Sequence, residues 1–205
     1  MIIAIEGTSF VGKSVLVEQL KGFLGQREYL YFADYVEAIR NTRPSEEIPP
    51  GLLPTIENQI EATKQFLRVE TDRFNLAIQE DDSRIIIVDR SIFTLIGHAY
   101  AIEFGYSQDG LYDQISRLVF EWHRKLTPTH LIVLTVPQII LERRYPPKKT
   151  KNVFMSQQYN YHFNQYLENL EFPRKLVISG AQSIRGTLQL VVDFITPDIN
   201  DSRWR

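Results

Sequence analysis

An eight-residue segment near the start of the chain constrains the fold more than any other feature. Gly7 to Ser14 reads Gly-Thr-Ser-Phe-Val-Gly-Lys-Ser, which fits the pattern G-x-x-x-x-G-K-[ST]. The apolar run Ile2–Ile5 precedes it, and a segment with helical spacing follows it. Because glycine lacks a Cβ atom, the backbone can wrap closely around an anion. The pattern therefore predicts a phosphate-binding loop between a buried strand and a helix.

Each part of this loop has an expected role in binding a nucleotide. Successive backbone N–H groups and the helix N-terminus would surround the phosphates, and Lys13 would reach the β- and γ-phosphates. The Ser14 hydroxyl would bind Mg²⁺, so ATP and Mg²⁺ are the predicted cofactors. No Asn-Lys-x-Asp motif for reading guanine occurs in the sequence. The residues expected to contact ATP are Gly7, Thr8, Ser9, Phe10, Val11, Gly12, Lys13, Ser14 and Val15.

Five short apolar runs predict the strands of one sheet. Most are apolar throughout and do not alternate, which is typical of strands buried on both faces of a parallel sheet. Helical patterns alternate with these runs and favour a three-layer α/β fold. The predicted strands are Ile2–Ile5, Tyr29–Ala33, Ile85–Val88, Leu131–Val136 and Leu176–Ile178. The predicted helices are Val15–Leu24, Thr55–Glu80, Leu111–Leu126, Val153–Leu170 and Ile184–Ile195.

Length and composition indicate a single domain over residues 1–205, with a C-terminal tail at 197–205. The net charge of −2 argues against a strongly basic nucleic-acid-binding protein, and the absence of cysteine excludes disulfides and thiolate metal sites. No apolar stretch approaches the roughly 20 residues of a membrane helix, and the first residues lack the pattern of a secretory signal. We therefore expect a cytoplasmic protein without nucleic-acid or membrane partners.

Asp89 ends the third predicted strand and is followed by Arg90 and Ser91. An acid at this place is typical of the magnesium site of phosphate-loop proteins, so Asp89 is predicted to be a catalytic residue and a metal ligand beside Ser14. A helix N-cap is the alternative role, because Asp is favoured there. The forked guanidinium of Arg90 suits bidentate phosphate binding, and an ordinary surface arginine is its alternative.

The long predicted helix Thr55–Glu80 carries charged residues on and beside its apolar stripe. Arg73 shares the edge of that stripe with Phe66, so its side chain points either into a cleft or along the core surface. Glu70 lies deeper on the stripe, where a paired carboxylate is as plausible as a site residue.

A basic stretch at 142–152 follows the fourth predicted strand and a short helical piece. We expect it to be a helical lid that closes over the transferred phosphate and excludes water, with Arg143 and Arg144 as catalytic residues. A solvated run of charge is the alternative. The basic residues around Pro146-Pro147 are Arg143, Arg144, Lys148, Lys149 and Lys151.

The chain resembles the thymidylate kinase and deoxynucleoside kinase group of P-loop kinases. The matching segments are Ile5–Gly7, Leu67–Arg73, Val88–Ser91, Pro128–Pro137 and Leu141–Arg144. The resemblance implies a five-stranded parallel sheet in the order 2-3-1-4-5. It also implies that Arg90 holds an acceptor phosphate and Arg73 the acceptor base. The full set predicted to bind the acceptor is Arg90, Arg73, Glu70, Phe66 and Ser9.

The departures from the group's pattern concern the acceptor side. Ser9 stands where thymidylate kinases carry an acid that touches the sugar, and Val69 stands where they place an aromatic residue against thymine. The Arg-Glu-Pro-Gly-Gly turn of thymidylate kinases and the Glu-Pro motif of deoxynucleoside kinases are both missing after the second strand. Asp34 or Glu37 can replace the carboxylate of the latter motif, and Asp34 is our candidate.

These observations predict an ATP-dependent phosphotransferase that acts on a nucleotide, a nucleoside or a similar small metabolite. An alcohol acceptor requires a carboxylate within reach of its hydroxyl, for which Asp34 is the candidate. A phosphate acceptor requires no base and depends more on Arg90. The alternative function is a P-loop NTPase that regulates another protein by binding it. The acceptor's identity and the formation of a homodimer remain open at this stage.

Overall fold

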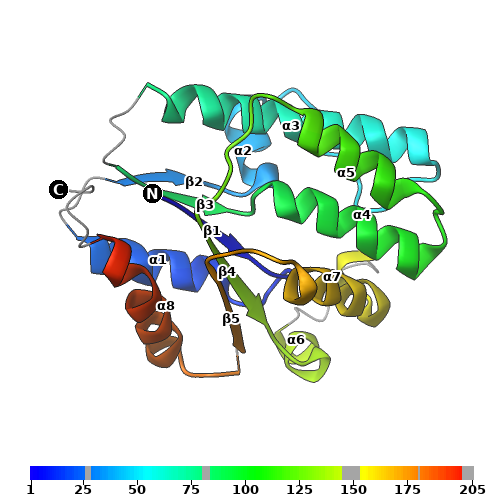
Figure 1. Cartoon of the computed structure of the whole chain (residues 1–205). Coiled ribbons are helices and arrows are strands. Elements are labelled where there is room, and N and C mark those ends of the chain that lie inside the picture. The colour runs from blue at the N-terminus through cyan, green and yellow to red at the C-terminus, as the bar shows by residue number, and fades with distance from the viewer. Residues whose placement is uncertain (26–28, 80–83, 145–152, 180, 200–205) are drawn as a thin grey trace.

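A computed structural model describes residues 1–25, 29–79, 84–144, 153–179 and 181–199. Five strands form one sheet in the order β2-β3-β1-β4-β5, and every neighbouring pair is parallel (Figure 1). The strands are β1 (Ile2–Glu6), β2 (Tyr29–Phe32), β3 (Ile85–Asp89), β4 (His130–Thr135) and β5 (Lys175–Ser179). The predicted α/β class and the strand order implied by the resemblance are confirmed.

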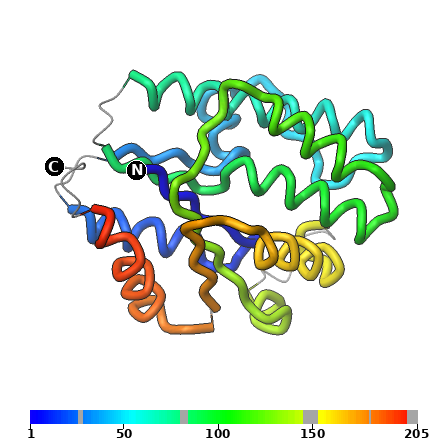
Figure 2. Tube along the Cα trace, viewed as in Figure 1, coloured from blue at the N-terminus to red at the C-terminus, as the bar shows by residue number. Residues whose placement is uncertain are grey.

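Helices cover both faces of the sheet. Figure 1 shows α1 and α8 on one face and α3, α4 and α5 on the other. In the Cα trace of Figure 2, α7 runs beside α4, and the two helices share one apolar cluster. The helices are α1 (Lys13–Leu24), α2 (Tyr35–Thr42), α3 (Ile56–Ala77), α4 (Ile92–Tyr106), α5 (Leu111–Glu121), α6 (Gln138–Arg144), the 3₁₀ turn η1 (Val153–Met155), α7 (Gln157–Asn169) and α8 (Ile184–Ile199).

Alternate residues of the inner strands β3, β1 and β4 enter different halves of the core. Ile3 and Ile5 of β1 pack in a cluster with Leu20 of α1. Ala4 points the other way and packs in a cluster with Ile96 of α4. The sheet is therefore buried on both faces, which explains why its strands read as continuous apolar runs. None of the helices in the described residues is both long and apolar enough to cross a bilayer.

Helix α4 was absent from the predicted helices. Ten of its 15 residues are buried, so it shows no polar face and no helical stripe in the sequence. The predicted helix Val153–Leu170 is divided, because Ser156 caps α7 by accepting a hydrogen bond from the Tyr159 amide. Helix α8 continues through Pro197 to Ile199, so it includes the first residues of the tail predicted at 197–205.

The expected lid falls mostly on residues that the structure does not describe. Residues 142–144 form the last turn of α6, and residues 145–152 lie outside the described ranges. The lid therefore stays a prediction, apart from the helical start that carries Arg143 and Arg144.

Candidate active site

The phosphate loop connects the end of β1 to the start of α1, as its sequence pattern predicts. Gly7 and Gly12 adopt φ angles of 142° and 114°, which favour glycine. A Cβ atom on Gly7 would lie 2.4 Å from the carbonyl oxygen of Leu134. Strand β4 therefore packs directly against the loop, and only glycine fits at this position. Phe10 at the loop's tip has a φ of 64° and is exposed.

Lys13 points back into the loop. Its side chain is only 7% exposed, and Nζ donates to the carbonyl oxygens of Gly7 at 3.1 Å and Thr8 at 3.0 Å. Burial, together with the nearby Arg90 charge, lowers the pKa of Lys13 to about 7, although Asp89 opposes the shift. A bound anion would raise the pKa again, because it favours the charged amine. Lys13 is therefore placed to respond to phosphate in the loop.

Asp89 lies at the carboxyl end of β3, beside Ile5 in the sheet register. It is 4% exposed, and none of the described residues forms a hydrogen bond with its Oδ1 atom. Burial raises the pKa of Asp89, although the charges of Lys13 and Arg90 act in the opposite direction. Asp89 is not the N-cap of α4, because the Ser91 hydroxyl accepts the Phe93 amide in that role. The capping alternative for Asp89 is thereby removed.

Asp34 follows the end of β2 and caps α2, where Oδ1 accepts from the Glu37 amide at 2.9 Å. Its charge raises the pKa values of both Asp89 and Lys13. The carboxyl ends of β2 and β3 therefore bring Asp34 and Asp89 to the same side of the phosphate loop. This is the arrangement expected for ligand sites in parallel α/β sheets.

Arg90 adopts a left-handed backbone conformation, with a φ of 66°, that is uncommon for residues other than glycine. Its Nη2 atom donates to the Ser9 hydroxyl at 3.4 Å, and its amide donates to the Ile5 carbonyl at 3.1 Å. The half-buried guanidinium therefore faces the phosphate loop, as the phosphate-binding prediction requires. Strained backbone of this kind tends to occur at functional sites.

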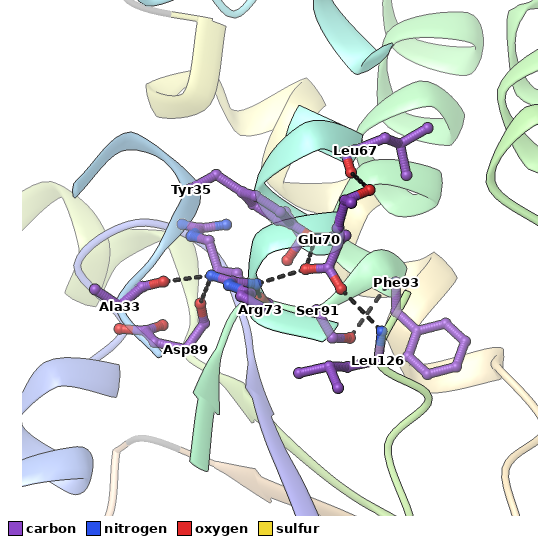
Figure 3. A network of polar contacts seen from close by, with 12 residues as sticks. Ala33, Tyr35, Leu67, Glu70, Arg73, Asp89, Ser91, Phe93 and Leu126 are labelled. Atoms are coloured by element: carbon purple, nitrogen blue, oxygen red, sulfur yellow. Dashed lines mark hydrogen bonds and ion pairs between the residues drawn. The ribbon is translucent and has the colours of Figure 1, made fainter. Parts of the chain in front are cut away.

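Arg73 and Glu70 form a buried ion pair on α3, with 2.6 Å between Nη1 and Oε1 (Figure 3). Both side chains are almost completely closed to solvent, at 3% and 0% exposure. The ion pair was the alternative to a site role for Glu70. Arg73, predicted to contact the acceptor, donates hydrogen bonds to Glu70 and to three backbone carbonyls. Phe66 is half-buried and packs against Tyr35, with ring centroids 5.5 Å apart.

Glu6 was not among the predicted site residues. It ends β1 directly before Gly7 and is fully buried. Its carboxylate accepts hydrogen bonds from the amide and hydroxyl of Ser91 and from the hydroxyl of Thr94. Burial raises the pKa of Glu6, while these hydrogen bonds lower it. The signal available in the sequence was an acid that closes an otherwise apolar strand.

Arg144 joins the outer side of the phosphate loop to a cavity. Its Nη1 atom donates to the carbonyl oxygens of Val11 at 2.9 Å and Phe10 at 3.3 Å. The cavity has a volume of about 320 Å³. The neighbouring Arg143, also predicted to be catalytic, lies exposed on α6. The contribution from the start of α8 was not predicted, because no motif marks that helix. The lining residues are Phe10, Val11, Gly12, Val15, Leu16, Leu134, Arg144, Gln182, Ile184 and Thr187.

Solved kinase structures share this fold. A thymidylate kinase from Candida albicans has a TM-score of 0.72 and 19% identity, over 97% of this chain and 92% of that chain. A deoxyadenosine kinase from M. mycoides with the products dCMP and dCDP bound has a TM-score of 0.63 and 18% identity, over 96% of this chain and 100% of that one. The same enzyme with bound dATP has a TM-score of 0.65 and 16% identity, with coverages of 96% and 99%.

The sequence matches no protein-family model and no curated protein. Identities below 20% establish a shared architecture and leave the chemistry to be argued from the site.

Proposed function

We propose that this protein is a P-loop phosphotransferase that transfers the γ-phosphoryl group of MgATP to a small acceptor of the nucleoside or nucleotide class. One observation carries the proposal: Lys13, Asp34, Asp89 and Arg90 surround one end of a phosphate loop. Three solved structures of similar fold are kinases, and each aligns over 96% or more of this chain. The shared architecture and the local chemistry support the same function.

The donor nucleotide would extend from the phosphate loop into the cavity beside Arg144. Amides of the loop and the N-terminus of α1 would hold the phosphates, with Lys13 against the β- and γ-phosphates. Apolar side chains of Val15, Leu16 and Ile184 line the cavity and suit the faces of a purine base. The guanidinium of Arg144 lies between this cavity and the loop carbonyls, close to the path of the phosphates.

Asp89 and Ser14 fit a magnesium ion. The buried Oδ1 of Asp89, which has no hydrogen-bond partner in the described part of the chain, is a hard oxygen ligand of the kind that Mg²⁺ prefers. Ser14, the second residue of α1, would supply the other oxygen. No group of three His, Asp or Glu side chains among the described residues could hold a metal by itself. The two side chains would therefore share the ion with phosphate oxygens. The bound metal would neutralise charge on the phosphates.

The charge balance near the acceptor favours an alcohol over a phosphate. Asp34 and Asp89 face the site, while Arg73 is occupied by protein atoms. Among the described residues, Arg90 contacts Ser9 at this side of the loop and could meet an acceptor phosphate. Asp34, at the end of β2, is well placed to accept the proton of an acceptor hydroxyl. The hydroxyl oxygen would bond to the γ-phosphorus as the bond to the leaving ADP breaks.

Screening the purified chain with MgATP against nucleosides, nucleotides and small hydroxylated metabolites tests this proposal. We expect ADP release that depends on one acceptor class. Lys13→Ala should lower that rate by roughly a hundred- to a thousandfold, because a contact made in the transition state is lost. Lys21→Ala is the matched control on α1, since Lys21 pairs with Glu18 outside the loop.

Two results would reject the phosphotransferase. ADP release that no acceptor stimulates would favour the regulatory NTPase. Full activity of a folded Lys13→Ala variant would contradict the role given to the phosphate loop.

A further inference from the structure

The guanidinium of Arg73 occupies the point where β2 and β3 end (Figure 3). It donates to the carbonyl oxygens of Ala33, of Asp89 at 3.5 Å and of Arg90 at 2.8 Å. Ala33 is the residue before Asp34. The guanidinium also lies over the ring of Tyr35, the residue after Asp34, at 4.6 Å from the ring centroid. Arg73 therefore contacts the backbone or ring on both sides of Asp34, and the backbone of Asp89.

These contacts link the two chain segments that follow β2 and β3, beyond the last hydrogen-bonded pair of the two strands. The last paired residues of the two strands are Phe32 and Val88. Further along, the chains diverge into α2 and into the turn before α4. Arg73 bridges the two chains immediately after the last pair. One side chain from α3 therefore connects the backbone directly before Asp34 to the backbone of Asp89.

The bridge requires a guanidinium. Three carbonyl oxygens and a carboxylate lie around it, and its five N–H donors spread in a plane can reach them together. A lysine ammonium at the end of a flexible chain concentrates its three donors at one atom. Arg73→Lys therefore keeps the positive charge but cannot reach all of these oxygen atoms at once.

Glu70 fixes the orientation of Arg73 and neutralises its charge. Oε1 of Glu70 accepts from Arg73 and, at 3.0 Å, from the Tyr35 hydroxyl. Oε2 accepts from the amide of Leu126 at 3.3 Å. A buried charge without such partners would be strongly destabilising, so the pair acts as a unit.

Arg73 also supports the strained backbone of Arg90. A left-handed residue other than glycine persists only where its surroundings hold it in place. The bond from Arg73 to the Arg90 carbonyl supplies part of that restraint. The direction of the Arg90 side chain towards Ser9 depends on the same backbone turn.

We infer that Arg73, oriented by Glu70, is a positioning residue that holds Asp34, Asp89 and Arg90 in their reactive arrangement and does not contact the acceptor. The inference rests on the proposed function for the roles of those three residues. It differs from the role that the family resemblance implied, in which Arg73 holds the acceptor base.

Steady-state kinetics of Arg73→Lys separate the two roles. Loss of positioning should lower kcat by about ten- to a hundredfold, because small displacements of reacting groups have effects of this size. The KM values for ATP and for the acceptor should stay within about threefold of the parent values. Arg68→Lys is the matched control, since Arg68 is exposed on the same helix and its activity should be unchanged. An increase in acceptor KM with kcat retained, or no change in either parameter, would overturn the inference.

Amide hydrogen exchange gives a readout that does not depend on turnover. In Arg73→Lys, residues 33–35 and 89–91 should lose protection together, although they are distant in the sequence. Arg68→Lys should leave both segments protected. A parent protein that phosphorylates no acceptor would reject the proposed function, and the exchange pattern would still decide the structural bridge. Unchanged protection in Arg73→Lys would overturn it.

A milder variant tests the same inference if Arg73→Lys does not fold. Tyr35→Phe removes one hydrogen bond to Glu70 and leaves the ring beneath Arg73. Loss of one such bond should give the same kcat effect at a smaller size, about two- to fivefold. A folded Tyr35→Phe variant with parental kcat and parental exchange in both segments would argue against the bridge.

Discussion

The Oε1 atom of Glu6 lies 2.7 Å from both the amide nitrogen and the hydroxyl oxygen of Ser91. The Thr94 hydroxyl contacts the other carboxylate oxygen. These bonds tie the end of β1, directly before the phosphate loop, to the first turn of α4. Glu6→Ala should lower the free energy of unfolding by about 3 kcal/mol or more, because buried donors lose their acceptor. Chemical denaturation measures the loss.

The stabilities of two further variants are to be compared with that of Glu6→Ala. Glu6→Gln keeps the size and one acceptor, so it should be less destabilising than Glu6→Ala. Glu61→Ala is the surface control, since Glu61 is exposed on α3 and pairs with Lys64. Equal stability of Glu6→Ala and Glu61→Ala would show that the Glu6 network contributes little.

Arg90→Ala distinguishes the two classes of acceptor. For the alcohol acceptor proposed above, kcat should fall by about a hundredfold while the acceptor KM stays near its parental value, because Arg90 would serve the transferred phosphate. A monophosphate acceptor would instead lose a charge-assisted contact, and its KM would rise strongly. Arg40→Ala, an exposed position on α2, is the control. If both parameters are unchanged in Arg90→Ala, the acceptor site has been placed wrongly.

Ile184→Trp tests the cavity beside the phosphate loop. Ile184 lines the cavity and is 57% exposed, so a larger ring can enter the space without disturbing the core. We expect the KM for ATP to rise about tenfold and the acceptor KM to remain unchanged, since only the base of the donor would be displaced. Leu190→Trp adds the same ring elsewhere on α8, outside the cavity lining, and should have no effect. Equal ATP kinetics in the two variants would contradict the assignment of the cavity.

His98 should make the protein sensitive to acid. Burial, and then the Arg90 charge, lower the pKa of His98 from 6.5 to about 4. Between these values the unfolded chain binds a proton that the folded chain does not, so stability is full above pH 6.5 and falls as the pH is lowered towards 4. The contribution is at most about 3 kcal/mol.

Denaturation of His98→Gln at pH 7 and pH 5 measures this effect. The variant should lose less stability between the two pH values than the parent, because its side chain does not titrate. His123→Gln, at an exposed position, should retain the parental pH dependence. An unchanged pH dependence in His98→Gln would assign the acid sensitivity to other groups.

The features that the sequence predicted well depend on neighbouring residues in the chain. The phosphate loop is a contiguous motif, and the buried strands are contiguous apolar runs. The placement of Asp34 and Asp89 near Lys13 could be anticipated from the rule that ligands sit beyond the carboxyl ends of parallel strands. Helix α4 was missed for the converse reason, since a helix buried on nearly every side has no periodic polar face.

The features that the sequence could not supply depend on contacts between distant segments. Besides Glu70, Arg73 donates to the backbone carbonyls of Ala33 and Arg90, directly after β2 and β3, and a carbonyl has no signature in the sequence. A paired carboxylate was one of the two roles considered for Glu70, and the structure contains its ion pair with Arg73. The cavity beside Arg144 also uses residues at the start of α8, and no motif in the sequence marks that helix as part of the site.

The central position of β1 determines when the phosphate loop can form during synthesis of the chain. β1 is hydrogen-bonded to β3 on one side and to β4 on the other, and β4 ends at Thr135. The loop glycine Gly7 also packs against the Leu134 carbonyl. The phosphate loop is therefore synthesised before the strands that flank it, and it can reach its folded arrangement only after β4, through Thr135, has been made.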